Sequence, residues 1–258
     1  MRIVVLTKPV PDPTAAERLG PDTRVDRNGS NVINGNDEYA LEAALKLVET
    51  HGGEVTLVAM SPESGRDVLR KGLAMGATRG VLIRDPALAG SDWLTTARVL
   101  AAAVRGLEFD LLLAGVDTSD GGAGLLPAGL AALLELPYLS NAASIEPVGA
   151  GVRVQRITAT GFETLEAAVP AVIGGTQALG APRYPTLKGI MGARSKEIAV
   201  QTLADLGLDP ATTGGPVTGT RVVELRQPPA RGATRVVRGP AADAAREVVD
   251  FLATRGLV

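Results

Sequence analysis

The first half of the chain alternates short apolar runs with longer segments whose apolar positions recur at helical spacing. Apolar runs of strand length occupy 2–7, 54–60, 80–85 and 110–115, as is typical of strands buried on both faces of a parallel sheet. The segments between them, among them 34–50, 61–76 and 91–106, have the periodicity and end signals of helices. Regular alternation of strand and helix indicates crossover units. The predicted fold class is therefore α/β, a Rossmann-like parallel sheet with helices on both faces.

Residues that favour helix ends locate the first two helices. Asn36 is the expected N-cap of the first, with Asp37 and Glu38 in its first turn, where acidic side chains interact well with the helix dipole. Ser61 is expected to cap the second helix, and Gly76 follows its last residue. The stretch KPVPDP (8–13) lies between the first strand and the first helix. It is too rich in proline for either regular element.

The pattern changes after Gly115. A helix is expected at 125–135, and successive strands with polar turns are expected over 140–172. These strands predict an antiparallel extension of the sheet.

The C-terminal part has a different composition. Residues 209–240 are rich in Gly, Pro, Thr and Arg and predict an extended arm, which ends in a helix with an apolar stripe. We therefore expect an α/β domain over 1–208 and a C-terminal arm and helix over 209–258. The sequence leaves open whether this last helix packs on its own domain or on a partner.

Composition excludes several classes of function. The 258 residues are 45% apolar and only 3% aromatic, so the core must be built mainly from Ala, Val and Leu. Cysteine is absent, which excludes disulfides, zinc–thiolate sites and thiol nucleophiles. The net charge of −2 offers no basic surface for nucleic acid. No apolar run reaches the roughly 20 residues of a membrane span, and a strand begins at residue 2, so we expect a soluble, cytoplasmic protein without direct membrane insertion.

Candidate catalytic groups are scarce. The one histidine, His51, stands at the expected C-terminus of a helix, where the dipole favours it in a solvent-exposed position. No P-loop, nucleophile elbow or zinc-binding helix motif occurs, and no nucleophile–base pair is evident. Electron or hydride chemistry would therefore come from a bound cofactor. This pattern favours an electron carrier without catalytic residues of its own.

The segment that follows the strand at 110–115 predicts a ligand site. The strand ends at Gly115, and a polar loop with Asp120 and three glycines (Gly121, Gly122 and Gly124) opens the next helix. Helix N-termini present unpaired amides and bind phosphate, and glycines let a ligand approach the backbone. In open α/β sheets, ligands lie beyond the carboxyl ends of strands. The alternative is a tight strand-to-helix connection without a ligand.

A second unusual segment is the polar, basic stretch 183–194, interpreted as a mobile loop. It carries four apolar side chains where water should meet them: Tyr184, Leu187, Ile190 and Met191. Apolar anchors on a basic loop indicate a docking surface. The alternative is a loop that folds back over a small satellite core.

Several motifs in the second half occur in a recognisable order. They are GFETLE at 161–166, PAV at 170–172, PRY at 182–184, and Leu187 followed by Ile190 and Met191. In this the chain resembles, over nearly its whole length, the beta subunits of electron transfer flavoproteins. The resemblance implies a heterodimer with an alpha subunit that holds most of the FAD. It also implies docking to acyl-CoA dehydrogenases through Leu187, and electron delivery to a membrane quinone oxidoreductase. The docking residues that it implies are Arg183, Tyr184, Leu187, Ile190 and Met191.

The same resemblance implies a structural AMP in this subunit. The cofactor-binding positions carried over are Leu6, Asn34, Gly35, Asn36, Asp37, Met60, Gly115, Asp120, Gly121, Gly122, Ala123, Gly124, Leu125 and Leu126. Many relatives have Asn-Gln-Thr-Gly where this chain has residues 124–127, Gly-Leu-Leu-Pro. Side-chain contacts to the phosphate are thereby lost, so binding is expected to rely on backbone amides and the helix dipole.

Three alternatives remain at this point. A bifurcating-type subunit would bind a second FAD in place of AMP, although the loop after Asp120-Gly121 departs from the sequence of that subset. An ATP-pyrophosphatase type enzyme would use a similar sheet, but its catalytic loop is missing. A stand-alone adenine-nucleotide sensor, like universal stress proteins, would leave the 161–196 segment and the arm without a role.

Overall fold

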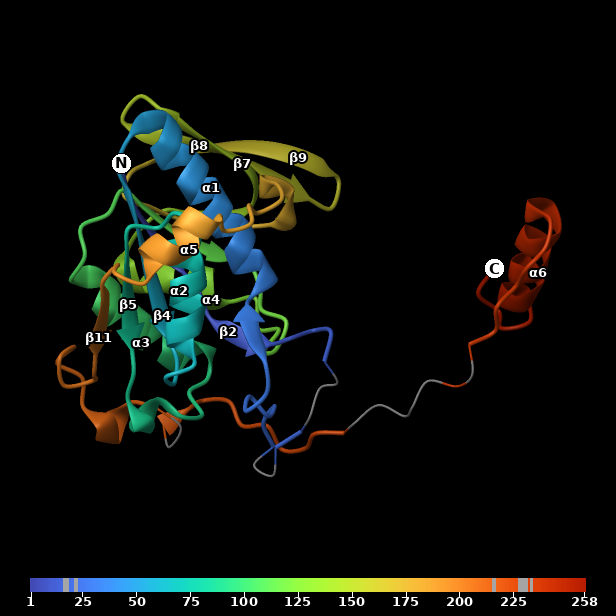
Figure 1. Ribbon diagram of the computed structural model, residues 1–258, viewed down its shortest axis with the longest axis horizontal. Helices are drawn as coiled ribbons and strands as arrows, with labels where there is room; N and C mark the ends of the chain where they lie inside the picture. The colour runs from blue at the N-terminus through green and yellow to red at the C-terminus, as the bar shows by residue number, and fades with distance from the viewer. Residues whose placement is uncertain (16–18, 21–22, 215–216, 227–231, 233) are drawn as a thin grey trace. The chain divides into compact units, whose positions relative to one another are not determined.

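The computed structural model describes residues 1–15, 19–20, 23–214, 217–226, 232 and 234–258. The chain divides into two compact units, Met1–Val223 and Glu224–Val258, which are described separately (Figure 1). The boundary expected after residue 208 stays a prediction. The first compact unit also includes residues 209–223, the beginning of the expected arm.

The first unit is built on a mixed sheet that has nine strands within the described residues. From one edge to the other these are β11 (Ile198–Gln201), β5 (Arg79–Ile83), β4 (Glu54–Met60), β1 (Arg2–Leu6), β6 (Leu111–Gly115), β10 (Ala171–Gly175), β7 (Tyr138–Val148), β8 (Gly151–Thr158) and β9 (Gly161–Ala168). Neighbouring strands pair in parallel from β11 to β7. The pairs β7–β8 and β8–β9 are antiparallel. The parallel sheet and its antiparallel extension are both as predicted.

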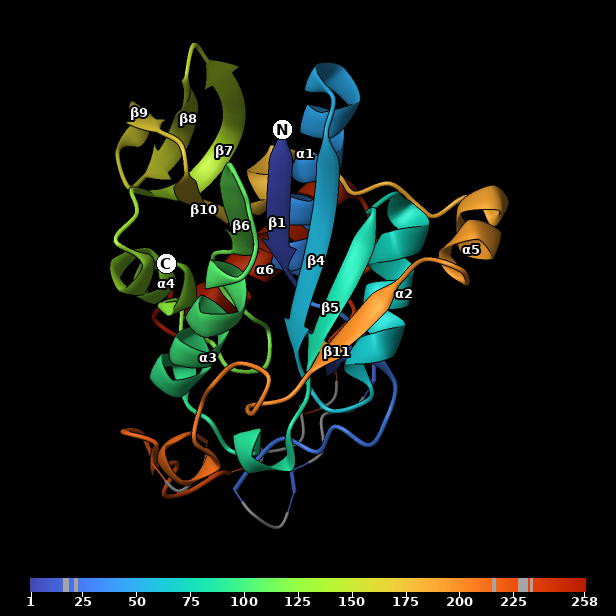
Figure 2. The ribbon, with the colours of Figure 1, turned by 90° about the vertical axis from the view of Figure 1, so that its left-hand side faces the viewer.

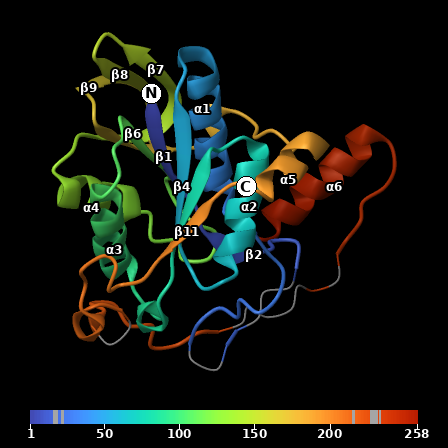
Figure 3. The ribbon, with the colours of Figure 1, turned by 60° about the vertical axis from the view of Figure 1, so that its left-hand side comes forward.

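Helices cover both faces of this sheet (Figure 2; Figure 3). Their bounds are α1 (Gly35–His51), α2 (Gly65–Met75), α3 (Trp93–Arg105), α4 (Leu126–Leu134) and α5 (Leu187–Ala193). The faces alternate along β1, since Ile3 and Val5 join the core with α1 and α2, whereas Val4 and Leu6 join the core with α3 and α4. The predicted α/β architecture is therefore confirmed, with a buried core on each face.

Three details of the N-terminal half differ from the prediction. Helix α1 begins at Gly35 after the cap position Asn34, so Asn36 lies inside the helix and does not cap it. Helix α2 begins only at Gly65, because a turn over residues 62–66 precedes it, so Ser61 is not its cap. The proline-rich stretch does contain a strand, β2 (Pro9–Pro11), which pairs with β3 (Asn31–Ile33) in a two-stranded ribbon. A separate ribbon tolerates prolines because few of its amides must pair.

Four shorter or later elements complete the chain. The 3₁₀ turns are η1 (Pro86–Leu88), η2 (Gln177–Leu179) and η3 (Pro210–Thr212), and the predicted last helix is α6 (Ala241–Ala253). In the second unit, Phe251 on α6 stacks with the guanidinium groups of Arg235 and Arg255, at 5.9 and 4.3 Å from the ring centre. Val248 and Val249 of the predicted stripe stay about half exposed. In the part of the chain that the structure describes, no helix combines the length and the apolar composition needed to cross a membrane.

Candidate functional site

The carboxyl ends of β1 and β6 form the edge of the sheet at which open α/β folds usually bind ligands, and this edge is called the ligand edge below. The chain runs from β1 to β4 and β5 on one side and returns to β6 on the other. At such a switch point the following connections diverge and leave a crevice above the sheet. Here the connection after β1 leads into the N-terminus of α1, and the connection after β6 is the loop 116–125, which leads into α4.

Asp37 ties the ends of these two strands together. It lies in the first turn of α1 and is buried, and its Oδ1 accepts a hydrogen bond from the Gly115 amide at 3.2 Å. Its Oδ2 accepts one from the Lys8 amide at 3.1 Å. Burial raises the pKa of Asp37 to about 7, against the opposing effect of these amides and of Asn34. A Cβ at position 115 would lie 2.6 Å from this carboxylate, so the position requires glycine.

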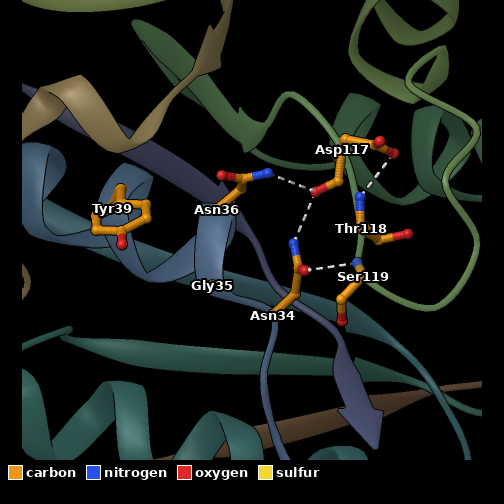
Figure 4. A pocket seen from close by; sticks show the side chains of 7 residues that line it. All are labelled: Asn34, Gly35, Asn36, Tyr39, Asp117, Thr118 and Ser119. Carbon is orange, nitrogen blue, oxygen red and sulfur yellow. Dashed lines mark hydrogen bonds between the residues drawn. The ribbon is translucent and has the colours of Figure 1, made fainter. Parts of the chain in front are cut away.

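Two asparagines join the start of α1 to the loop 116–125 (Figure 4). Asn34 is buried, donates to the carbonyl of Asp117 at 2.9 Å and accepts from the amide of Ser119 at 3.2 Å. Asn36 donates to the same carbonyl at 3.2 Å. Their side chains, with those of Tyr39 and the loop residue Thr118, line a hollow of about 250 Å³.

An ion-pair cluster is centred on Asp120, a residue of this loop with a buried side chain. Asp120 has a side chain that is only 1% exposed, and its Oδ1 accepts a hydrogen bond from Lys8 Nζ at 2.9 Å. Its second oxygen forms an ion pair with Arg27. Burial raises the pKa of Asp120, but the charges of Lys8 and Arg27 and their hydrogen bonds outweigh it and hold the pKa below its usual value. With Asp120 ionised, its pairing with Lys8 and Arg27 gives this three-residue cluster a net charge of +1.

The glycines after Asp120 shape a turn that presents backbone amides. Gly122 and Gly124 have φ values of +56° and +60°, a conformation that favours glycine. The Gly124 amide bonds to Asp117 Oδ1 at 3.1 Å, and the Gly121 and Gly122 amides bond to Thr118. The next amides, before and within the first turn of α4, find no hydrogen-bond partner among the described residues: those of Ala123, Leu125, Leu126 and Ala128. Such unpaired amides at a helix N-terminus suit an anion.

Two hydroxyl groups at the ends of neighbouring strands also lack partners. Thr7 follows β1 and is 4% exposed, and Ser61 follows β4. The Oγ1 of Thr7 and the Oγ of Ser61 are buried atoms without a hydrogen bond among the described residues. A buried, unpaired hydroxyl is costly, so each fits a site that gains a polar partner when a ligand binds.

The structure gathers the predicted cofactor positions at one edge. Leu6, Met60 and Gly115 end β1, β4 and β6, residues 34–37 form the start of α1, and residues 120–126 lead into α4. The side chains of Asn34, Asp37 and Asp120, however, are engaged with the protein itself. Sequence reasoning did not place Lys8, Arg27 or Thr7 at this site, and it gave Ser61 only the role of a helix cap. Polar residues directly after apolar strands would have signalled Thr7 and Ser61, whereas the contact of Arg27 with Asp120 depends on the tertiary fold.

The predicted docking residues lie apart from this edge, in and before α5. The prediction of a loop was wrong for residues 187–193, which form a short helix. Thr186 caps it by accepting a hydrogen bond from the Gly189 amide at 3.1 Å. Tyr184, Leu187, Ile190 and Met191 are all exposed, Tyr184 by 92% and Leu187 by 75%. Arg183 differs from them, because its guanidinium contacts carboxylates on α1.

In the described part of the chain, no group of three or more His, Cys, Asp or Glu side chains is arranged to hold a metal ion.

Comparison with known proteins gives a consistent answer. Residues 22–206 match the model of the electron transfer flavoprotein domain. The chain is 34% identical to the electron transfer flavoprotein subunit beta of Mycobacterium leprae, with 99% of each chain covered. It is 33% identical to that of Thermoanaerobacterium thermosaccharolyticum over the full length of both, and 34% identical to that of Bacillus subtilis over 88% of each. By its fold and by these likenesses, the chain belongs to the electron transfer flavoprotein family, in the group of its beta subunits.

Proposed function

We propose that this chain pairs with an alpha subunit and binds a structural AMP, while the alpha subunit holds most of an FAD. The heterodimer takes electrons from acyl-CoA and related dehydrogenases and passes them, through a membrane quinone oxidoreductase, to the respiratory chain. The chain itself contributes no catalytic residue. The observation that carries the nucleotide assignment is the group of unpaired amides at the start of α4, in a member of this family.

The residues at the sheet edge fit an adenine mononucleotide. The amides of Ala123, Leu125, Leu126 and Ala128 would receive the phosphate, because the α4 dipole adds to their attraction. The net positive charge of the Lys8–Asp120–Arg27 cluster favours the same anion.

The neutral part of AMP needs polar partners as well. Thr7 and Ser61 each offer a hydroxyl that can donate and accept, which suits the ribose or the edge of the base. Since Leu125 and Leu126 have apolar side chains, backbone amides must supply the phosphate contacts in this chain.

The role of this chain toward FAD is to form part of its surroundings. FAD, when bound, supplies the reversible uptake of electrons that no side chain provides. The segment 8–13, which contains β2 and carries Pro13 where relatives often have an aromatic residue, would approach the flavin.

The nucleotide content of the purified heterodimer tests the cofactor assignment. The chain is co-expressed with an alpha subunit, the complex is denatured, and the released nucleotides are quantified by mass spectrometry. We expect one FAD and one AMP per heterodimer. Two FAD and no AMP would contradict the AMP assignment and support the bifurcating type. A monomer that carries AMP and recruits no flavin-binding partner would support the sensor.

The docking role is tested at Leu187. Removing a side chain that a partner buries costs about 1.5–3 kcal/mol, so Leu187→Ala should raise the KM for the dehydrogenase roughly 10- to 100-fold. FAD content and heterodimer formation should not change. Val200→Ala is the matched control, because Val200 is an exposed apolar residue on the edge strand β11. Unchanged reduction kinetics in Leu187→Ala would remove the docking claim.

A further inference from the structure

Helix α5 is anchored to α1 through Arg183, a residue four positions before it. The Nε of Arg183 donates to Glu42 Oε2 at 2.8 Å and its Nη2 donates to Glu42 Oε1 at 3.1 Å. The same guanidinium donates to Glu49 Oε2 at 2.9 Å, and the backbone amide of Arg183 donates to Glu42 Oε2 at 3.1 Å. One arginine thus joins two carboxylates that lie two helical turns apart on α1.

Arg183 contacts one buried and one exposed carboxylate. The side chain of Glu42 is 4% exposed, whereas that of Glu49 is 54% exposed. Burial raises the pKa of Glu42, but the hydrogen bonds and charge of Arg183 hold it below its usual value. Without Arg183 this buried carboxylate would lose all of its short charged hydrogen bonds and would keep Lys46, whose Nζ lies 3.7 Å from Glu42 Oε1. Arg183 therefore has one strongly preferred position, and it fixes the chain that enters α5.

The other end of α5 is anchored to α2 by two cations in a crossed arrangement. Arg70 on α2 donates to the carbonyls of Ala193 and Lys196, the latter at 2.7 Å. Lys196 in turn donates to the carbonyls of Leu73 and Ala77, at 3.0 and 2.6 Å. Arg70 thus serves the carbonyl of the last residue of α5, and Lys196 serves carbonyls at and just beyond the C-terminal end of α2, where the helix dipole favours positive charge.

Such anchoring is needed because α5 is not stable by itself. A helix of seven residues is far below the length of about 12 residues at which isolated helices become marginal in water. Its outer side chains are exposed, so they contribute little burial of their own. Without the anchors, the helix would have to be ordered when a partner arrives, and that ordering would weaken binding.

We propose that Arg183 and Glu42, together with the Arg70–Lys196 pair, are positioning residues that hold α5 in its docking conformation before the dehydrogenase binds. The proposal rests on the proposed docking function. Arg183 acts through α5 and does not itself contact the partner. The exposed apolar residues make the contact, and the charged anchors set its affinity by removing the cost of ordering.

Two measurements on the FAD-containing heterodimer test this role. Hydrogen exchange, followed by mass spectrometry of peptides that cover 186–194, reports the order of α5. Steady-state reduction by the dehydrogenase reports KM and kcat separately. Arg183→Met should speed exchange in α5 and raise KM roughly tenfold, with kcat unchanged, because fewer molecules are docking-competent. Arg183→Lys keeps the charge but loses the fork of donors, so it should restore only part of the wild-type KM.

Arg183→Met leaves the buried Glu42 with Lys46, at 3.7 Å and itself half exposed, as its charged partner among the described residues, so a second variant guards against loss of folding. The double variant Glu42→Leu with Arg183→Met removes both charges, and such replacements keep a fold intact. It should show the same faster exchange and the same higher KM. Arg153→Met is the matched control, because Arg153 forms exposed ion pairs on β8, away from α5.

The possible results separate the positioning role from docking itself. Unchanged exchange in α5 in both Arg183→Met and the double variant would overturn the anchor. Faster exchange with an unchanged KM would overturn its role in recognition. Leu187→Ala should raise KM while exchange in α5 stays at the wild-type rate. If Leu187→Ala left KM unchanged, the docking surface would be refuted, and exchange in Arg183→Met would still show whether the anchor holds α5.

Discussion

Asp37 is a carboxylate whose two oxygens both serve backbone amides, one at the end of β1 and one at the end of β6. Two hydrogen bonds favour its charged form, yet burial disfavours that form more strongly, so the pKa rises to about 7. The ligand edge is therefore held together by a group that titrates near neutral pH. Its protonation is linked to stability.

The sign of this linkage gives the first prediction. Between pH 3.8, the ordinary pKa of this carboxyl, and about pH 7, its pKa in the folded protein, folded Asp37 keeps a proton that the unfolded chain releases. The contribution of Asp37 to the free energy of unfolding therefore falls as the pH rises through this range. At about 1.4 kcal/mol per pKa unit the change approaches about 4 kcal/mol. Asp37→Asn lacks this dependence. Its free energy of unfolding should lie below that of the wild type by an amount that shrinks from pH 5 to pH 8. Urea unfolding of both proteins across this range checks it. Parallel pH profiles would contradict the role of Asp37.

Thr7 gives a second prediction, in which one substitution raises the stability of the AMP-free protein and lowers its affinity for AMP. Its hydroxyl has no partner among the described residues, and valine has the same shape without the hydroxyl. Thr7→Val should therefore raise the free energy of unfolding by about 1 kcal/mol in the absence of AMP. If the hydroxyl contacts AMP, the same change should lower AMP affinity, which calorimetric titration measures.

A matched control for Thr7 lies on the next strand. Thr56 is equally buried, but its Oγ1 accepts a hydrogen bond from Arg79 at 3.1 Å. Thr56→Val should therefore destabilise the protein and leave AMP affinity unchanged. Destabilisation by Thr7→Val without AMP would show that this hydroxyl has a partner in the folded chain.

At the scale of elements, the apolar runs predicted the central strands because burial on both faces leaves little room for polar residues. The antiparallel extension followed from alternating residues and turns over 140–172. Strand β11 was missed, since four residues at a half-exposed edge carry little signal. Helix α5 was missed because Pro185, two glycines and exposed apolar side chains are typical of a loop. Only the cap at Thr186 and the contacts with α2 make it a helix.

The ligand edge was predictable for similar reasons and to a similar extent. Strand ends and the glycine cluster located the edge, since the carboxyl ends of parallel strands meet there. The partners of the polar side chains could not be read from the sequence. Lys8 and Asp120 are 112 positions apart, and Asn34 bonds to a loop 83 positions away. Such pairs exist only once the sheet is formed.

The two glycines of α5 give a matched pair of variants for the third prediction. A Cβ at Gly189 would lie 2.3 Å from the carbonyl oxygen of Ala74 on α2, whereas a Cβ at Gly192 would meet nothing within 4 Å. Gly189→Ala must push α5 away from α2 and should cost about 1–3 kcal/mol. Gly192→Ala should stabilise by about 0.5–1 kcal/mol, because alanine favours helix. Urea unfolding measures both. Equal effects would show that α5 is not closely packed on α2.

At the scale of the whole molecule, the chain separates into a unit with two buried cores and a unit whose described residues form no such core. Every buried apolar residue of the two cores belongs to the first unit. In the second unit, no residue of α6 is buried, and the helix keeps a half-exposed stripe that includes Val248 and Val249. An amphipathic helix usually gains its stability by burying such a stripe against another surface.

The last prediction commits that stripe to the alpha subunit. A chain that ends at Val223 keeps both cores and the ligand edge, so it should fold and bind AMP with nearly unchanged affinity. It should fail to co-purify with the alpha subunit, as measured by affinity capture and size-exclusion chromatography. In the full-length chain, Val248→Ser with Val249→Ser should weaken the heterodimer in the same direction. Val222→Ser is the control, because Val222 is also an exposed apolar residue and its replacement leaves α6 intact. If the truncated chain still formed a heterodimer of wild-type stability, the arm and its helix would contribute nothing to assembly. The contact of the stripe with the alpha subunit would then be refuted.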